Sequence, residues 1–165
     1  MNPPAALRCA PMTAATRADA RALLGAFLGA DEHYRASAAR YGDGGTVALE
    51  HALDLFFARP EIGFVWLAQV PDGASFRTVG ACVVCYGIST SRGSVVAKLD
   101  DVTIHTDWQG RGVGNGMLGA LIGELRAKGI TRIDCGCHRD NTGAWRFYER
   151  LGFAPLDEER IALLL

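Results

Sequence analysis

The stretch Gln109-Gly110-Arg111-Gly112-Val113-Gly114 decides how this sequence is expected to fold. It follows a β-branched run, Val102-Thr103-Ile104, and precedes a helical pattern over residues 115–128. Three glycines in six residues leave a turn without Cβ atoms, so several backbone N–H groups can converge on one oxyanion. The N-terminus of the following helix adds unsatisfied amides and the positive end of a dipole. A strand, a glycine turn and a helix in this order predict a binding site for a pyrophosphate.

Composition places the chain among ordinary globular proteins. It has 165 residues, 49% of them hydrophobic, and a formal net charge of −1. That length suits one domain over residues 1–165, and the small charge argues against a broad nucleic-acid or anionic-membrane interface. The sequence also has no run of about 18 apolar residues. We therefore expect neither a nucleic-acid partner nor a membrane association.

The five cysteines are expected to be free thiols. The start of the sequence has neither the charged nor the apolar region of a secretory signal, so we expect a cytoplasmic protein in which thiols stay reduced. Cys82 and Cys85, like Cys135 and Cys137, fall in apolar or alternating runs. With His138 nearby, their spacing is only weakly similar to that of a zinc site, and no metal is expected.

Hydrophobic periodicity predicts a mixed α/β protein. A strand over residues 7–10 is followed by two helices, with caps at Thr16 and Thr46 and with inward faces formed by Leu23, Leu24, Phe27, Leu28, Leu49, Leu53, Phe56 and Phe57. Further strands are expected over 62–70, 78–86, 94–105 and 131–137, further helices over 115–128 and 142–151, and a last extended segment with an optional strand over 161–165. This order predicts a central mixed β-sheet with helices on both faces.

A second pattern overlaps the glycine stretch. Gly114, Gly116 and Gly119 satisfy the G-x-G-x-x-G pattern of dinucleotide-binding folds, with Asp134 at the spacing of a ribose ligand. In that fold the first glycine directly follows the strand, whereas here it already enters the helix. This interpretation is therefore disfavoured, and the absence of a Gly-Lys-Ser/Thr sequence excludes a Walker loop.

Two signatures of this sequence resemble those of the GNAT superfamily of acetyl-CoA-dependent N-acetyltransferases. The first is Gln109-x-x-Gly112-x-Gly114. The second consists of Asn141, Ala144, Phe147, Tyr148, Glu149, Leu151, Gly152 and Phe153. Their order, and their separation by one βα unit, make the resemblance specific over residues 62–154, while the N-terminal helices match only loosely. The Leu99-Asp100-Asp101 run looks most like the diamine (spermidine/spermine-type) acetyltransferase branch.

The resemblance implies a GNAT-type acyl-CoA N-acyltransferase fold with acetyl-CoA as cosubstrate. Its pantetheine arm would pair with the backbone of the strand that precedes the glycine stretch, and its phosphates would bind the stretch itself. The residues that the resemblance assigns to the cosubstrate are Val102, Thr103, Ile104, Gln109, Gly110, Arg111, Gly112, Val113, Gly114, Asn115, Asn141 and Ala144.

Acetyl transfer to an amine needs a base for the amine, donors for the oxyanion and an acid for the leaving thiolate. The resemblance implies Tyr148 as the acid. Asp100 and Asp101 compete for the role of base. Because side chains alternate along a strand, only one of them is expected to face the substrate, and the family's spacing favours Asp100. His105 and His138 stay alternative bases, since an imidazole titrates near neutrality.

The acceptor is expected to be a small primary amine that attacks directly in a ternary complex. Polyamine-like amines come first, followed by amino acids, aminoglycosides and protein amines. His33, Tyr34 and Tyr86 are expected to contact the acceptor. A non-catalytic acyl-CoA-binding or regulatory module is the rival interpretation, and it would lack the acid and the base. A homodimer is expected from the apolar run over residues 161–165.

Overall fold

The computed structural model describes residues 4, 6–30, 35, 36, 40, 45–137 and 140–155. The chain forms two compact units, Met1–Cys135 and Gly136–Leu165. The elements of the first unit are β1 (Arg8–Pro11), α1 (Arg17–Ala30), α3 (Gly45–Ala58), β2 (Gly63–Asp72), β3 (Ser75–Ser89), β4 (Ser94–Ile104), α4 (Val113–Ala127) and β5 (Ile133–Cys135). The second unit contains α5 (Thr142–Arg150). The prediction of one domain over residues 1–165 stays a prediction.

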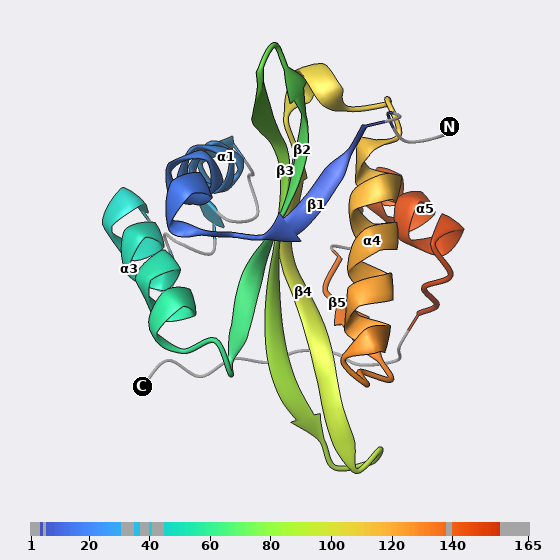
Figure 1. Cartoon of the computed structure of the whole chain (residues 1–165). Helices are drawn as coiled ribbons and strands as arrows, with labels where there is room; N and C mark the ends of the chain where they lie inside the picture. Colours follow the sequence, from blue (N-terminus) through green and yellow to red (C-terminus); the bar gives the residue numbers. More distant parts are fainter. Residues whose placement is uncertain are drawn as a thin grey trace. The chain divides into compact units, whose positions relative to one another are not determined.

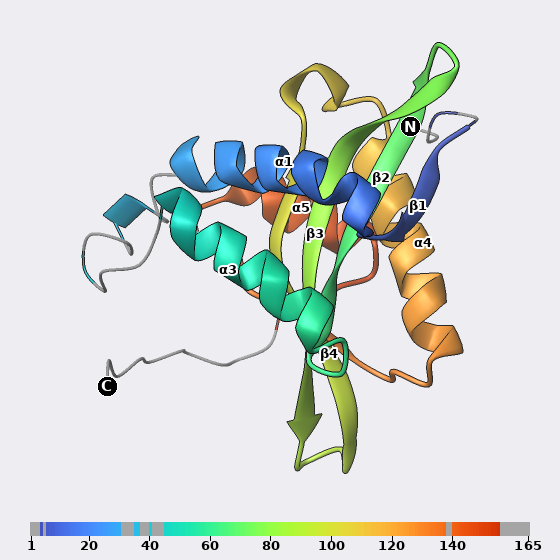
Figure 2. The same ribbon diagram turned by 60° about the vertical axis from the view of Figure 1, so that its left-hand side comes forward.

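The first unit is built on a five-stranded mixed sheet in the order β1-β2-β3-β4-β5. Neighbouring strands from β1 to β4 are antiparallel, and β5 runs parallel to β4. α1 and α3 cover one face of this sheet, and α4 covers the other (Figures 1 and 2). The predicted mixed α/β architecture is therefore confirmed.

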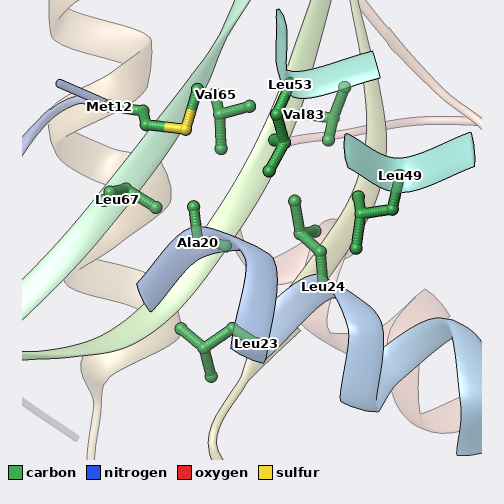
Figure 3. Packing of buried hydrophobic residues seen from close by; sticks show 10 residues of the cluster. Met12, Ala20, Leu23, Leu24, Leu49, Leu53, Val65, Leu67 and Val83 are labelled. Carbon is green, nitrogen blue, oxygen red and sulfur yellow. The ribbon is translucent and has the colours of Figure 1, made fainter. Parts of the chain in front are cut away.

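Strand alternation lets one sheet serve two cores. Val65 and Leu67 of β2 point toward α1 and α3, where they join a buried cluster (Figure 3) completed by Met12, Ala20, Leu23, Leu24, Leu49, Leu53, Ala81 and Val83. Trp66 lies between them and points the other way, and its Nε1 donates to the carbonyl of Met117 in α4 at 3.1 Å. Each buried Leu or Val side chain contributes about 1.5–3 kcal/mol, so both helical layers are held chiefly by burial.

Local details of the first two helices differ from the prediction. The segment before α1 begins with a short 3-10 helix, Ala14–Thr16, and the N–H of its cap Thr13 donates to Thr16 Oγ1 at 2.9 Å. α3 begins at Gly45, so Thr46 is not its cap. Phe57 is 42% exposed although Leu49 and Leu53 are buried, and the inward stripe of α3 is thus narrower than predicted.

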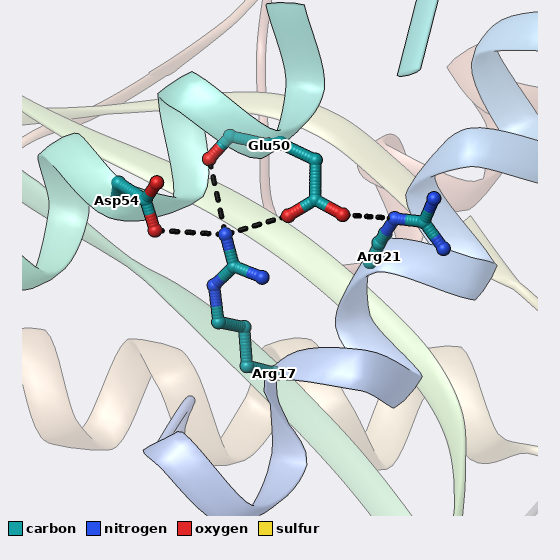
Figure 4. A network of polar contacts seen from close by, with 4 residues as sticks. All are labelled: Arg17, Arg21, Glu50 and Asp54. Carbon is teal, nitrogen blue, oxygen red and sulfur yellow. Dashed lines mark hydrogen bonds and ion pairs between the residues drawn. The ribbon is translucent and has the colours of Figure 1, made fainter. Parts of the chain in front are cut away.

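An ionic network joins α1 to α3 (Figure 4). Arg17 Nη2 lies 2.6 Å from Glu50 Oε2 and 2.7 Å from Asp54 Oδ1, and Arg21 Nε pairs with Glu50 Oε1. Partly exposed ion pairs contribute only about 0–1 kcal/mol each. The network therefore fixes how the two helices lie against each other more than it stabilises them.

Two further expectations concern membrane association and the apolar run over residues 161–165. No helix in the part of the chain that the structure describes is long and apolar enough to cross a membrane. The optional strand over residues 161–165, on which the expected homodimer rests, lies outside the described residues.

Candidate active site

The loop between β4 and α4 is shaped by two glycines in the left-handed conformation. Gly110 has a φ of 69° and Gly112 a φ of 80°, values at which an L side chain is strained. Gly112 is also the N-cap of α4, and its carbonyl accepts from the N–H of Gly116 at 3.0 Å. Left-handed residues in such a turn gather successive N–H groups into a nest for an anion, here at the positive end of a helix.

Gln109 ties this loop to the end of β4. Its Nε2 donates to the carbonyl of Ile104 at 3.0 Å. The N–H of the next residue, His105, donates to Val79 on β3 at 2.8 Å, so Ile104 directs its own N–H and C=O to the opposite edge of β4. The exposed Arg111 has its guanidinium carbon 5.3 Å from the centroid of the Trp108 ring. Gln109 thus has a local structural role in holding the loop, and Arg111 presents a cation on it.

β4 has strand partners on both edges along only part of its length. β3 pairs with it as far as Ile104, whereas β5 pairs only with residues 97–99. In the described part of the chain, no strand pairs with residues 102–104 on the side of β5. A strand edge of this kind can pair with an extended ligand that carries amide groups.

A β-bulge interrupts β4 beside the two predicted bases. β3 pairs with Asp100 and next with Thr103, so Asp101 and Val102 together oppose one residue, Cys82. Asp101 has a φ of 49°, a conformation that aspartate tolerates better than most residues. The predicted regular alternation through this segment is therefore wrong, because Asp100 and Thr103 share a face although they are three residues apart.

Asp100 lies on the face of the sheet that α1 and α3 cover, because its partner Val83 belongs to the core on that side. Its Oδ2 is 2.8 Å from Nζ of Lys98, two residues earlier on the strand. Burial raises the pKa of the neighbouring Cys82 thiol well above its usual range, and the carboxylates of Asp100 and Asp101 add to the effect. This thiol is therefore protonated at neutral pH.

Two described residues predicted for the acceptor or the base, Tyr86 and His105, lie elsewhere than Asp100 does. The ring of Tyr86 lies 6.0 Å from that of Phe64, which lies 6.1 Å from Trp66 on the α4 face. Tyr86 and Asp100 are thus on opposite faces of the sheet. His105 Nδ1 accepts from the N–H of Asp107 at 3.3 Å, in the turn that follows β4. The predicted residues His33, Tyr34 and His138 lie outside the described residues.

The second unit holds Asn141, Ala144 and Tyr148. Asn141 is the N-cap of α5, and its Oδ1 accepts from the N–H of Ala144 at 3.0 Å. The half-buried Tyr148 ring lies 5.2 Å from the ring of Phe147 and 5.4 Å from that of Phe153. These contacts give all three residues a structural role within the unit, and their roles toward the cosubstrate and the thiolate stay predictions.

The structure also draws attention to charged residues that the motifs did not assign to the site. Arg132 Nη2 donates to Asp134 Oδ2 at 2.9 Å, and Asp134 is in register with Lys98 across the β4–β5 pair. In the sequence, a cation stands two residues before an aspartate in both Lys98-x-Asp100 and Arg132-x-Asp134. This repeated spacing is the sequence feature by which these four residues could have been found. That the two pairs are neighbours follows only from the strand register.

Comparison with known proteins identifies relatives of the chain. A family model described as the acetyltransferase (GNAT) family matches residues 56–153. An uncharacterized N-acetyltransferase of Methanocaldococcus jannaschii is 30% identical over 98 residues, which cover 54% of this chain and 43% of that protein. Mycothiol acetyltransferase of Nocardiopsis dassonvillei is 33% identical over 94 residues, covering 57% of this chain and 28% of the relative. The chain thus spans less than half the length of these curated relatives.

Solved structures agree on the fold. AAC(6')-Iy, in complex with the bisubstrate analogue CoA-S-monomethyl-acetylneamine, has a TM-score of 0.68 to this chain at 15% identity. The match covers 95% of this chain and 97% of that one. A likeness at this identity shows the fold alone, and it confirms the predicted fold class.

Proposed function

The chain belongs to the acetyltransferase (GNAT) family, and we propose that it transfers the acetyl group of acetyl-CoA to the primary amine of a small molecule. The observation that carries this proposal is the junction of β4 with α4. A strand edge along residues 102–104 leads directly into the nest formed around Gly110 and Gly112. CoA has the matching order of groups, since the amides of its pantetheine arm can pair with the edge while its pyrophosphate binds the nest.

Acetyl transfer needs a base, an oxyanion site and an acid, and we assign these tasks to residues of this chain. The neutral amine attacks the thioester carbon, so a C–N bond forms, the C–S bond breaks and the amine loses a proton. A backbone N–H group that faces the free edge of this segment, such as that of Ile104, would stabilise the oxyanion. Asp100 accepts the proton, directly or through water, and Tyr148 supplies a proton or hydrogen bond to the leaving thiolate. Asp101 is the alternative base.

Direct attack in a ternary complex is favoured over a covalent acyl-enzyme. Cys85 has its thiol on the Asp100 face of the sheet, opposite Lys98 in the β3–β4 register. Burial raises the pKa of Cys85, the Asp100 carboxylate raises it further, and Lys98 opposes them. A thiol whose pKa is raised is protonated at neutral pH and is a poor nucleophile.

A polyamine-like acceptor is the first choice that the resemblance of Leu99-Asp100-Asp101 suggests. The two carboxylates support it, since they can pair with an ammonium group. The ion pair between Asp100 and Lys98 weakens that support, because the carboxylate already has a cation 2.8 Å away. The identity of the amine is therefore decided by the set of charges around Asp100 rather than by the two aspartates alone.

Calorimetry with CoA tests the junction. Gly112→Val places a side chain where the phosphates would approach, and we expect CoA affinity to fall by about 100-fold or more as charge-assisted hydrogen bonds are lost. Gly73→Val is the matched control: Gly73 has a φ of 61° with open space around its Cβ position, so it carries the same strain in the turn between β2 and β3. Both variants are checked for folding by circular dichroism.

An assay of turnover distinguishes an acetyltransferase from a non-catalytic acyl-CoA-binding module. Wild-type protein with acetyl-CoA and a panel of primary amines should release CoA thiol and form acetylated amine in equal amounts. Unchanged CoA binding by a folded Gly112→Val variant would show that the nest is not the phosphate site. CoA binding without acetylation of any amine would instead favour the non-catalytic module.

A further inference from the structure

Four charged side chains form one set across β4 and β5: Lys98, Asp100, Arg132 and Asp134, here called the charged quartet. Lys98 is in register with Asp134. Asp100 stands two residues after Lys98 on β4, and Arg132 stands two residues before Asp134, directly before β5. Lys98 and Asp100 lie opposite Cys85 and Val83, which pack in the core beneath α1 and α3. The quartet therefore lies on that face of the sheet, and Asp100 is its member next to the bulge.

The quartet is neutral as a whole, because its two carboxylates are matched by two cations. Its side chains are 22–36% exposed, so they are in reach of a small solute. Asp101, next to the quartet in the bulge, adds one further carboxylate, so a diamine would still bring one more positive charge than these groups can match. A molecule that carries one ammonium and one carboxylate keeps the set neutral and offers each of its charges a partner.

The two ion pairs of the quartet differ in how firmly they are made. Arg132 contacts Asp134 through two nitrogens, a hydrogen bond of 2.9 Å from Nη2 and a buried contact of 2.7 Å from Nε that lacks hydrogen-bond geometry. Lys98 reaches Asp100 through one ammonium contact at 2.8 Å, and both side chains are about one-third exposed. Water screens such a pair, so opening it costs little. Lys98 is thus the cation that can turn to a ligand, while Arg132 and Asp134 hold the neighbouring strand.

We propose that the acceptor of this enzyme carries a carboxylate beside its amine, as an α-amino acid does, and that Lys98 binds that carboxylate. The inference rests on the proposed function. Asp100 is nearest to residues 102–104, where the thioester is expected, so it receives the amine. Lys98 lies two residues farther along β4, about 7 Å at the usual rise of a strand, on the same face. The bound acceptor separates Lys98 from Asp100 and gives each a new partner.

The test compares each acceptor with its own uncharged analogue. A panel of α-amino acids and their carboxamides is titrated into the CoA-loaded full chain by calorimetry, and the same compounds are assayed with acetyl-CoA. We expect the acids that bind to be preferred over their amides by about tenfold or more in affinity and in kcat/KM, the effect of one charge-assisted hydrogen bond. Lys98→Met should abolish this ratio, and Lys98→Arg should restore most of it.

Lys128→Met is the matched control, since Lys128 is the other lysine of the chain and follows α4, where it pairs with Glu124. That variant should keep the wild-type ratio of acid to amide. A wild-type enzyme that acetylates amides or diamines as well as the acids overturns the inference and leaves the acetyltransferase in place. So does a folded Lys98→Met variant that keeps the preference. Lys98-dependent binding of the acids without acetylation of any compound would support the carboxylate site and contradict the proposed function.

Discussion

The end of β4 with its loop differs from the middle of the same strand in the chemical groups that it presents to a ligand. The loop end relies on the backbone: left-handed Gly110 and Gly112, and a strand edge along residues 102–104. The middle relies on the side chains of the charged quartet, whose positions depend on strand register. A backbone site suits a ligand shared by many relatives, whereas a side-chain site changes its ligand with one substitution. If both proposals hold, recognition of the cosubstrate and of the acceptor is separable along one strand.

The largest effect is expected at Tyr148, which is proposed to act in the chemical step rather than in binding acetyl-CoA or the acceptor. Tyr148→Phe removes the hydroxyl proposed to assist the leaving thiolate and keeps a ring that can pack against Phe147 and Phe153. We expect kcat to fall by about 10²-fold or more, the usual scale of general acid help. CoA affinity from calorimetry and acceptor KM should stay near wild type, because the chemical step alone is affected.

Tyr86→Phe is the matched control for this substitution. It removes the same hydroxyl from a tyrosine that packs on Phe64, on the face of the sheet opposite Asp100. Its kcat and KM should remain close to wild type. A higher acceptor KM in Tyr86→Phe would return Tyr86 to the acceptor site that the sequence predicts. A parallel loss of thermal stability and activity in Tyr148→Phe would favour a packing role for Tyr148.

The second-largest effect is expected from substitutions of the two aspartates at the bulge in β4. Asp100→Asn and Asp101→Asn both keep shape and hydrogen bonding but cannot accept a proton, and asparagine tolerates the φ of 49° at Asp101. With Asp100 as the base, Asp100→Asn should lower kcat/KM by about 10²-fold or less, the lower end of general-base effects, since water can relay the proton. The loss should be greatest at low pH, where neutral amine is scarce.

Asp101→Asn should stay within about threefold of wild type at every pH, a minor change on the scale of general-base effects. The decisive measurement is the pair of pH–rate profiles at saturating acetyl-CoA. If Asp101→Asn instead shows the loss at low pH while Asp100→Asn behaves as wild type, Asp101 is the base. The acceptor would then lie nearer to the loop end of β4 than the charged quartet places it.

The sequence predicts the loop end of β4 far better than its middle. The sequence identifies Gly110 and Gly112 because only glycine adopts a positive φ without strain, so the residue type itself indicates the backbone conformation. The bulge at Asp101 is not visible, since it depends on how β3 and β4 pair and no residue type requires it. Lys98 and Asp134 are 36 positions apart, and only the parallel register of β5 makes them neighbours. Tyr86 and Asp100 occupy opposite faces of the sheet, which also depends on strand register, so the role of Tyr86 at the acceptor stays a prediction.

The smallest effect is expected at Cys85, and it decides whether the side-chain part of β4 only binds the acceptor or also carries the acetyl group. The pKa of this thiol is raised, so the reactive thiolate becomes abundant only above the usual range of a cysteine. Cys85→Ala should therefore change kcat/KM by about threefold or less, far below the scale of a lost nucleophile.

Iodoacetamide should label Cys85 slowly at neutral pH, faster as the pH rises, and faster still in denatured protein. A burst of one equivalent of CoA thiol in the absence of any amine, present in wild type and absent in Cys85→Ala, would reveal an acetyl-cysteine. The two parts of β4 would then be joined by a covalent intermediate, and the charged quartet would position an amine against Cys85 instead of against the thioester.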